Sequence, residues 1–94
     1  ASVAAQVSDF DALLAPTVPI IATRIDAVRE DKPFYAANAM LLRNPTVVNF
    51  LNGCAISLPC HAEGGAPVGL SVIGLGGQDD KILRLAHAIE AALA

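Results

Sequence analysis

The sequence predicts an α/β fold fragment with about three short strands and two main helical regions. Two short apolar runs, 55–59 and 68–75, are joined by a loop rich in glycine and proline, which favours two neighbouring strands. The segment 79–93 repeats apolar residues at helical spacing. The composition is 54% hydrophobic and 16% charged. A small self-contained domain needs more charged residues than this to cover its surface. The composition therefore indicates a piece of a larger protein.

The excess of apolar residues has a direct consequence for partners. We expect part of the surface to face protein that lies outside this chain, or a second copy of it. Ninety-four residues allow one small domain, so we treat 1–94 as a single piece without an internal boundary. The chain begins at Ala1 rather than at methionine, which fits a processed or excised piece.

Charge and cysteine usage exclude several classes of function. The net charge is −3 and the six Lys and Arg residues are scattered, which argues against nucleic-acid binding. No apolar run approaches the roughly 18 residues of a membrane span, and no basic region opens the chain as in a secretory signal. An extended segment would separate Cys54 from Cys60 by roughly 20 Å. We therefore expect two free thiols, as suits a cytoplasmic protein.

The first third of the chain predicts one strand between less regular segments. Residues 1–8 form a weak helix, and Phe10–Ala15 is a buried strand that Pro16 ends. Pro16 and Pro19 keep the following segment extended and out of a central ladder. The charged stretch Ile20–Pro33 is interpreted as a surface loop with one helical turn.

The middle of the chain predicts helix over about 35–52. Helical spacing begins near Phe34, and Asn44-Pro45 interrupts it, because asparagine is a good N-cap and proline suits the first helical position. A new short helix then starts at Pro45 and runs to about Asn52. Gly53 is expected to end it in the left-handed conformation.

The last forty residues predict an antiparallel strand pair and a helix. The strand 55–59 is apolar on both sides, and a seven-residue loop brings 68–75 back beside it. Gly69 and Gly74 weaken a strand, so we expect each to mark the close approach of another backbone or a ligand. The helix 79–93 has acidic residues in its first turn, where the helix dipole favours them.

No residue pattern in the chain predicts a catalytic or metal site. Adjacent residues on an extended backbone point to opposite sides, so Cys60 and His61 are interpreted as a buried thiol and a loop histidine rather than a catalytic pair. The cysteines and histidines are too few and wrongly spaced for a structural zinc site. Ser57 and Ser71 lie inside strands without a base nearby in sequence, so we do not expect either to be a nucleophile.

The order of the motifs resembles that of the amidase signature family. D-A-L-L-A-P-T-V-P at 11–19, R-N-P-T-V-V-N-F-L-N-G-C-A-I-S-L-P at 43–59 and A-P-V-G-L-S-V-I-G at 66–74 are followed by an acidic-capped helix. They look like the C-terminal quarter of that family. The chain departs from the family pattern at Cys54, where proline is common, and at Ser71, where glutamine is frequent.

The resemblance implies an α/β/α sandwich around a mixed sheet, and hydrolysis of small amides. In that family a Ser nucleophile, a second Ser in a cis peptide and a Lys carry the chemistry. These residues lie in an earlier region of the family's sequence, and none matches here. Lys32 is expected in a loop and Lys81 in the last helix. We therefore expect no catalytic residue, no cofactor and no metal in this chain.

The resemblance also suggests which residues shape a substrate pocket. If the break at Asn44-Pro45 lies by the substrate channel as in relatives, then Arg43, Thr46 and Asn49 line it. Alternatively, Thr46 and Asn49 only satisfy backbone groups at the helix junction.

The leading functional hypothesis is the C-terminal portion of an amidase, inactive alone, that completes the sheet and part of the pocket. Its partner would be the missing N-terminal part of the domain. An alternative is a fragment like the A chain of a glutamine-dependent tRNA amidotransferase. Those chains carry an Asp where Leu42-Arg43 stands here, which favours the plain amidase. A homodimerising module without catalysis is another alternative, and a thiol enzyme built on Cys60 ranks last.

Overall fold

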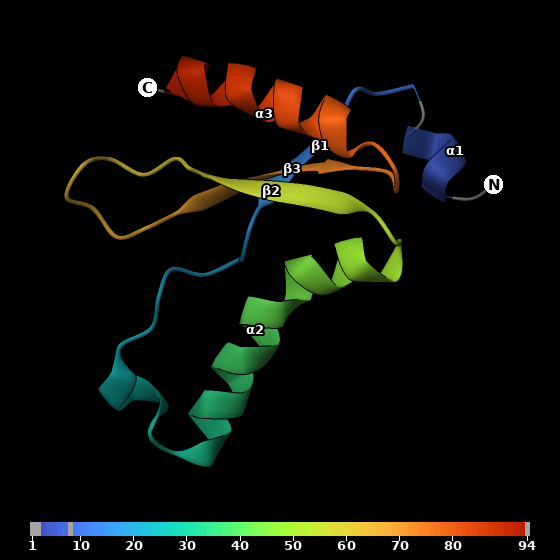
Figure 1. Cartoon of the computed structure of the whole chain (residues 1–94). Helices are drawn as coiled ribbons and strands as arrows, with labels where there is room; N and C mark the ends of the chain where they lie inside the picture. Colours follow the sequence, from blue (N-terminus) through green and yellow to red (C-terminus); the bar gives the residue numbers. More distant parts are fainter. Residues whose placement is uncertain (1–2, 8, 94) are drawn as a thin grey trace.

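The computed structural model describes residues 3–7 and 9–93. The elements in chain order are the helix α1 (Val3–Val7), the strand β1 (Leu13–Pro16), the short 3-10 helix η1 (Ile25–Val28), the helix α2 (Asp31–Phe50), the strands β2 (Cys54–Pro59) and β3 (Gly69–Gly74), and the helix α3 (Asp79–Leu93). Figure 1 shows α3 against one side of the sheet and α2 leaving from the other. No described helix is long and apolar enough to cross a membrane.

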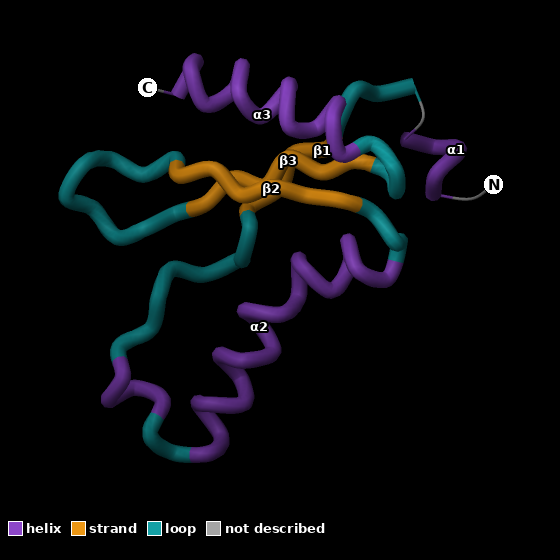
Figure 2. Tube along the Cα trace, viewed as in Figure 1, coloured by secondary structure: helices purple, strands orange, loops and turns teal. Residues whose placement is uncertain are grey.

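The three strands form one antiparallel sheet in the order β1-β3-β2 (Figure 2). The predicted pairing of the last two strands is confirmed, with Ser57 opposite Ser71 and Ile56 opposite Val72. β1 lies at an edge, as expected for a strand with Pro16 at its end and Pro19 shortly after it.

The first strand is shorter and later than the predicted Phe10–Ala15. Phe10 lies instead in a turn, where its backbone N–H donates to the oxygen of Val7 at 3.0 Å, and its side chain is exposed. Pairing with β3 begins only at Leu13, which lies opposite Ile73. The apolar run alone therefore placed the strand too early.

The predicted break at Asn44-Pro45 is wrong, because α2 runs without interruption from Asp31 to Phe50 with Pro45 inside it. Proline has no N–H, so it costs one helical hydrogen bond, to the carbonyl of Leu41 four residues earlier. The helix also begins earlier than predicted, which places Lys32 in its first turn rather than in a loop.

The end of α2 uses a different residue than expected for the left-handed position. Asn52 has φ 55°, whereas Gly53 has no positive φ. Asparagine tolerates this conformation because its short polar side chain bonds locally. Gly53 is needed for another reason: a Cβ there would lie 2.6 Å from the backbone oxygen of Gly74.

The core lies between α3 and the sheet. Within the described residues, the buried apolar side chains are those of Leu58, Val72, Ile82 and Ala86. The helical stripe predicted over 79–93 is therefore confirmed as the surface that covers β2 and β3. Gly74 permits this contact, since a Cβ there would lie 2.5 Å from Ile82 Cγ1. The close neighbour is thus a side chain, not the backbone or ligand that the sequence led us to expect.

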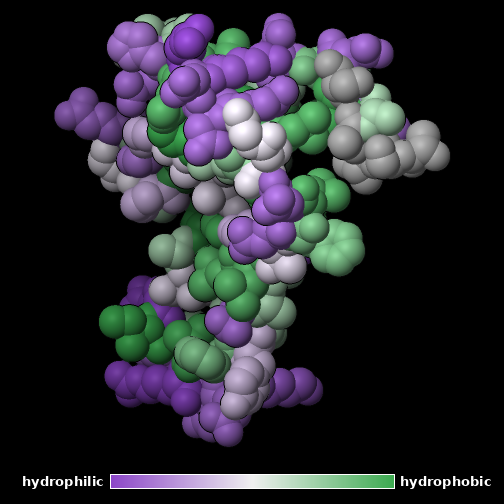
Figure 3. All heavy atoms as spheres, turned by 45° about the vertical axis from the view of Figure 1, so that its right-hand side comes forward, coloured by the Kyte–Doolittle hydropathy of each residue, from purple (hydrophilic) through white to green (hydrophobic). Residues whose placement is uncertain are grey.

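The rest of the molecule leaves large apolar side chains in solvent. The radius of gyration is 15.2 Å, against about 12 Å for a compact domain of this length. Phe50 is 87% exposed and Ile25 is 82% exposed, and Phe34, Tyr35 and Leu42 on α2 are exposed as well. Figure 3 shows apolar residues along the projecting part of the molecule, with hydrophilic residues at its far end. The exposed apolar surface that the composition predicted is therefore present, on α2 and η1.

Candidate functional site

Three hydroxyl groups meet on the side of the sheet opposite α3. Thr17 Oγ1 lies 2.6 Å from Ser57 Oγ and 2.9 Å from Ser71 Oγ. Thr17 comes directly after β1, and the two serines lie in β2 and β3. We call them the hydroxyl cluster.

The strand register brings the cluster together. Ser71 faces Ala15 on one side and Ser57 on the other, and side chains of paired residues project to the same side of a sheet. The next residue along β3, Val72, projects to the opposite side and is fully buried under α3. Thr17 follows β1 and stays in register, since its N–H donates to the oxygen of Gly69 at 3.0 Å.

Gly69 leaves the space that the cluster occupies. A Cβ at this position would lie 2.6 Å from Ser57 Oγ and 2.8 Å from Thr17 Oγ1. As at Gly74, the close neighbours are side chains rather than a backbone or ligand. A larger residue would force at least one hydroxyl to move.

A pocket of about 280 Å³ lies between the hydroxyl cluster and the C-terminal half of α2. Its lining combines the three hydroxyls with two amide side chains and with glycine, proline and aliphatic residues: Pro16, Thr17, Asn44, Pro45, Val48, Asn49, Gly53, Ala55, Ser57, Ser71 and Ile73. None of these lining residues carries a charge.

One hydrogen bond fixes the pocket wall from the helix side. Asn44 Nδ2 donates to the backbone oxygen of Pro16 at 2.7 Å, which ties α2 to β1. Arg43 Nε in turn donates to Asn44 Oδ1 at 3.3 Å. Asn44 lines the pocket, whereas Arg43 is not among its lining residues.

The three residues predicted to line a substrate pocket differ in whether they line the pocket described above. All three side chains are exposed, but only Asn49 lines the pocket, and Arg43 and Thr46 do not. Asn44 and the hydroxyl cluster line it but were not singled out for it from the sequence. The only sequence signal for the two serines is that each sits near the middle of a predicted strand, at positions that pair.

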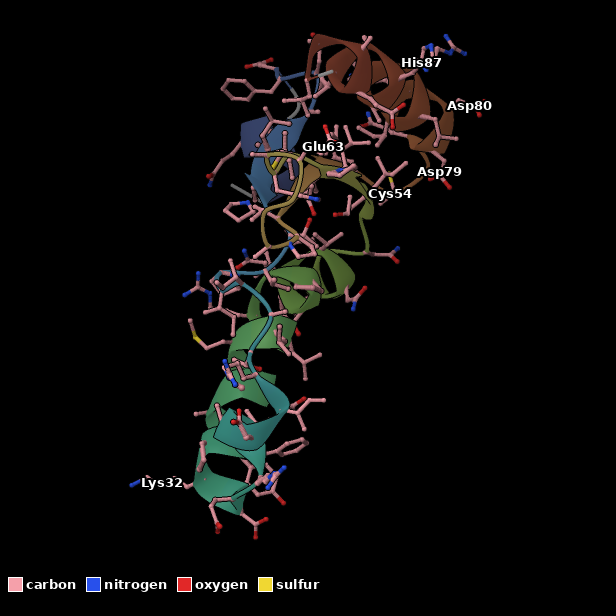
Figure 4. All side chains as sticks on the ribbon, turned by 90° about the vertical axis from the view of Figure 1, so that its left-hand side faces the viewer. Lys32, Cys54, Glu63, Asp79, Asp80 and His87 are labelled. Carbon is pink, nitrogen blue, oxygen red and sulfur yellow. The ribbon has the colours of Figure 1, made fainter. Side chains whose placement is uncertain are left out.

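The two cysteines are free, as predicted. Cys54 Sγ donates to the backbone oxygen of Leu75 at 3.4 Å, and burial raises the pKa of this thiol, with a further increase from the Asp79 carboxylate. Figure 4 shows Cys54 and Asp79 close together near the start of α3. Both effects favour the protonated, unreactive thiol.

Cys60 and His61 do not form a catalytic pair. Cys60 Sγ donates to the backbone oxygen of Val68 at 3.6 Å, and His61 Nδ1 accepts from the N–H of Val68 at 3.2 Å. Both residues thus close the end of the β2–β3 hairpin. Cys60 is exposed rather than buried as predicted, because it lies just beyond the end of β2.

The described residues contain no cluster of three or more histidine, cysteine, aspartate or glutamate side chains that could hold a metal ion.

The comparison with known families decides where this chain belongs. Residues 1–83 match the model of the family described as Amidase. The chain belongs to the amidase family. The resemblance carried by the sequence motifs is confirmed, and the three-stranded antiparallel sheet with its helices is consistent with a small α/β fragment.

Curated amidase-family relatives cover most of this chain. The A chain of the Glutamyl-tRNA(Gln) amidotransferase of Salinispora arenicola is 39% identical over 83 residues, which are 88% of this chain and 16% of the relative. The protein of the same name from Thermotoga maritima is 34% identical over 83 residues, 88% of this chain and 17% of the relative. The 2-amino-5-chloromuconic acid deaminase of Comamonas testosteroni is 30% identical over 86 residues, 90% of this chain and 19% of the relative.

This chain spans less than a fifth of the length of these relatives. No solved structure matches it.

Proposed function

We propose that this chain is the C-terminal portion of an amide-bond hydrolase, a single piece that completes the enzyme's sheet and supplies one wall of its substrate pocket. The observation that carries the proposal is the Amidase match over residues 1–83, in a chain that spans under a fifth of its relatives. The pocket between α2 and the hydroxyl cluster is the candidate for that wall. Asn49 lines it directly, and Arg43 and Thr46 lie on the same helix.

The catalytic serines and lysine are proposed to lie in the missing part, so this chain is inactive alone. Ser57 and Ser71 are engaged with Thr17. Lys32 lies at the far end of the projecting helix (Figure 4). Lys81 lies on α3, across the sheet from the cluster, and pairs with Asp11 at 3.7 Å. A serine nucleophile needs a base within hydrogen-bond reach, and these lysines are placed elsewhere.

The proposed partner is the N-terminal part of the same amidase domain. Its apolar surface would cover the exposed side chains of α2 and η1, such as those of Phe34, Tyr35 and Ile25. Exposed apolar area of this kind marks a contact with other protein. A second copy of the chain is the competing occupant.

A chimera tests the proposal. This chain would replace the matched 86-residue segment of the Comamonas testosteroni deaminase, and ammonia release from 2-amino-5-chloromuconic acid would be measured. We expect the chimera to fold and release ammonia, while the isolated chain turns over neither that compound nor simple amides such as acetamide. Turnover of an amide by the purified chain alone would refute the proposal.

The second candidate is a segment of the A chain of a tRNA amidotransferase. It is favoured by the 39% identity to the Salinispora arenicola protein, compared with 30% to the deaminase. The matching experiment transplants this chain into the Thermotoga maritima protein, where release of ammonia from glutamine is measured. A functional chimera in this background and not in the deaminase supports the second candidate.

Sedimentation distinguishes the remaining alternative. A homodimerising module would form a stable dimer of the isolated chain at micromolar concentration, with Phe50 or the projecting half of α2 buried in its interface. The proposed function predicts no such dimer of defined size.

A further inference from the structure

We propose that Asn52-Gly53, at the junction between α2 and β2, is a site of spontaneous deamidation whose rate is set by the opening of the last turn of α2. The product weakens the end of α2 and shifts the helix wall of the pocket beside the hydroxyl cluster. The reaction needs only water and hydroxide, so it is independent of the proposed function.

The first step is the residue pair itself. Glycine follows Asn52, and glycine has no side chain that would keep its backbone nitrogen away from the Asn52 carboxamide. The remaining asparagines of the chain are each followed by a larger residue: Asn38 by Ala39, Asn44 by Pro45 and Asn49 by Phe50. Proline also has no N–H from which a nucleophile could form. Asn52 is therefore the asparagine best placed in the sequence for attack by its neighbour.

The reaction balances with water alone. Hydroxide removes the proton of the Gly53 N–H, and the nitrogen attacks Cγ of Asn52. The new N–Cγ bond closes a cyclic imide, while the Cγ–Nδ2 bond breaks and Nδ2 leaves as ammonia after taking a proton from water. Water then opens the imide at either carbonyl carbon. One carboxamide and one water thus give ammonia and a carboxylic acid, as aspartate or isoaspartate at position 52.

The fold exposes the side chain but holds the attacking nitrogen back. Asn52 is exposed and has φ 55°, in the left-handed position after α2. Its N–H donates to the oxygen of Asn49 at 3.1 Å, and the Gly53 N–H donates to the oxygen of Val48 at 3.0 Å. This pair of bonds is the Schellman motif that ends many helices. A proton held in such a bond is not free to leave, so the attack requires the motif to open.

The motif can open without unfolding the core. None of the residues of α2, all of which the structure describes, is buried, and Phe50 in the last turn is 87% exposed. Local opening takes least free energy where few buried contacts hold a segment, as at an exposed helix end. The rate of deamidation is therefore the rate in the open motif multiplied by the fraction of time that the motif is open.

The product places a negative charge at the unfavourable end of a helix. The last carbonyl groups of a helix carry partial negative charge, so a carboxylate beside them is destabilising. The last turn of α2 contains no basic residue that would offset the new charge. Aspartate and isoaspartate at position 52 therefore both weaken the end of α2.

The isoaspartate product also lengthens the main chain, because the backbone then passes through the side-chain carbons. The surroundings leave no room for the added carbon. A Cβ on Gly53 would lie 2.6 Å from the backbone oxygen of Gly74, and a Cβ on Gly76 would lie 2.6 Å from the backbone oxygen of Asn52. The end of α2 must therefore shift against the sheet, which breaks the bond from Asn44 to β1.

The test follows the mass of the peptide that contains residue 52 while the full 94-residue chain is kept at mildly alkaline pH. Fragmentation locates the exchange of an amino group for a hydroxyl, and chromatography separates aspartate from isoaspartate. We expect residue 52 to react ahead of Asn38, and to react about tenfold faster in unfolding concentrations of urea than in the folded chain. A rate no higher than that of Asn38, or equal rates with and without urea, would overturn the proposal.

A matched pair of variants tests whether the last turn controls the rate. Val47 is 56% exposed, and its backbone oxygen accepts from the N–H of Leu51 in this turn. Val47→Gly and Val47→Ala both remove the same exposed side chain, but glycine disfavours the helix and alanine favours it. We expect deamidation at residue 52 to be about fivefold faster in Val47→Gly than in Val47→Ala. Equal rates in the two folded variants would contradict control by the last turn.

A third variant tests the effect on the pocket wall. Asn52→Gly removes the reacting carboxamide and keeps a residue that tolerates the left-handed position. After the same incubation, the unsubstituted chain is expected to lose helical circular dichroism and the NMR signal of the bonded Asn44 side-chain NH₂, in proportion to the modified fraction. Asn52→Gly should keep both signals. A fully modified chain with an unchanged Asn44 signal would refute the shift of the wall.

Discussion

Asn44 Nδ2 and the backbone oxygen of Pro16, 28 residues apart in sequence, lie 2.7 Å from one another. This contact joins the C-terminal half of α2 to the edge strand, and both residues line the candidate pocket. It also satisfies the one backbone group that Pro16 has, since proline has no N–H to donate.

Removing this bond is expected to loosen α2 from the sheet. Asn44→Ala should lower the free energy of unfolding by about 1 kcal/mol, measured by urea denaturation, after correction for the better helix propensity of alanine. Asn38→Ala, at an exposed asparagine of the same helix, supplies that correction. Equal stability of the two variants would mean that the bond to Pro16 contributes nothing.

Replacing the proline inside α2 tests whether the helix is continuous. Pro45→Ala restores an N–H opposite the carbonyl of Leu41, so we expect stabilisation by up to about 3 kcal/mol and a higher Tm. Helical content by circular dichroism should not fall. Destabilisation would instead support two helices separated at Asn44-Pro45, with proline favoured at the start of the second.

The contact between Gly74 and Ile82 makes the α3 interface intolerant of added volume. Gly74→Ala places a Cβ 2.5 Å from Ile82 Cγ1 and 2.7 Å from its Cδ1, so we expect a loss of about 1–3 kcal/mol in the free energy of unfolding. Ile82→Val removes Cδ1 and should recover part of the loss in the double variant. A double-mutant cycle with strictly additive effects would rule out this contact as the cause.

Alkaline pH is expected to destabilise the chain through Cys54. Burial, and then Asp79, raise the pKa of this thiol, so the folded state holds the proton more tightly than the unfolded state. Its contribution to stability is complete below the ordinary thiol pKa of about 8.5 and is lost as pH rises through the folded pKa. Urea unfolding between about pH 7 and 10 measures this loss, and Cys54→Ala should flatten the dependence above about pH 8.5. An unchanged slope in that variant would assign the effect to another group.

The C-terminal half of the fold could be predicted from the sequence, because the patterns that indicate its helix and strands are local in the chain. The stripe that includes Ile82 and Ala86 predicted both the helix and the surface it buries. The loop length predicted the antiparallel pairing of β2 and β3. The predicted break at Pro45 was wrong, because proline disfavours a helix locally while the rest of α2 and the Asn44–Pro16 bond hold it together.

The candidate pocket could be predicted only in part. Asn49, which was singled out because it follows the expected break at Asn44-Pro45, lies in the pocket lining. Thr17 was missed because it meets Ser57 and Ser71 across 40 and 54 residues, and that contact exists only once β1 pairs with β3. Strand order is a tertiary property, and one sequence does not show which distant residues contact each other.

The placement of α3 sets a direction for assembly. Because α3 covers Val72 and Leu58, a large partner cannot contact this face of the sheet unless the helix is displaced. Further protein that extends the sheet or packs on its other face would therefore approach from the side of α2 or along the strand edges. A tag attached to an exposed residue of α3 should consequently leave that approach open.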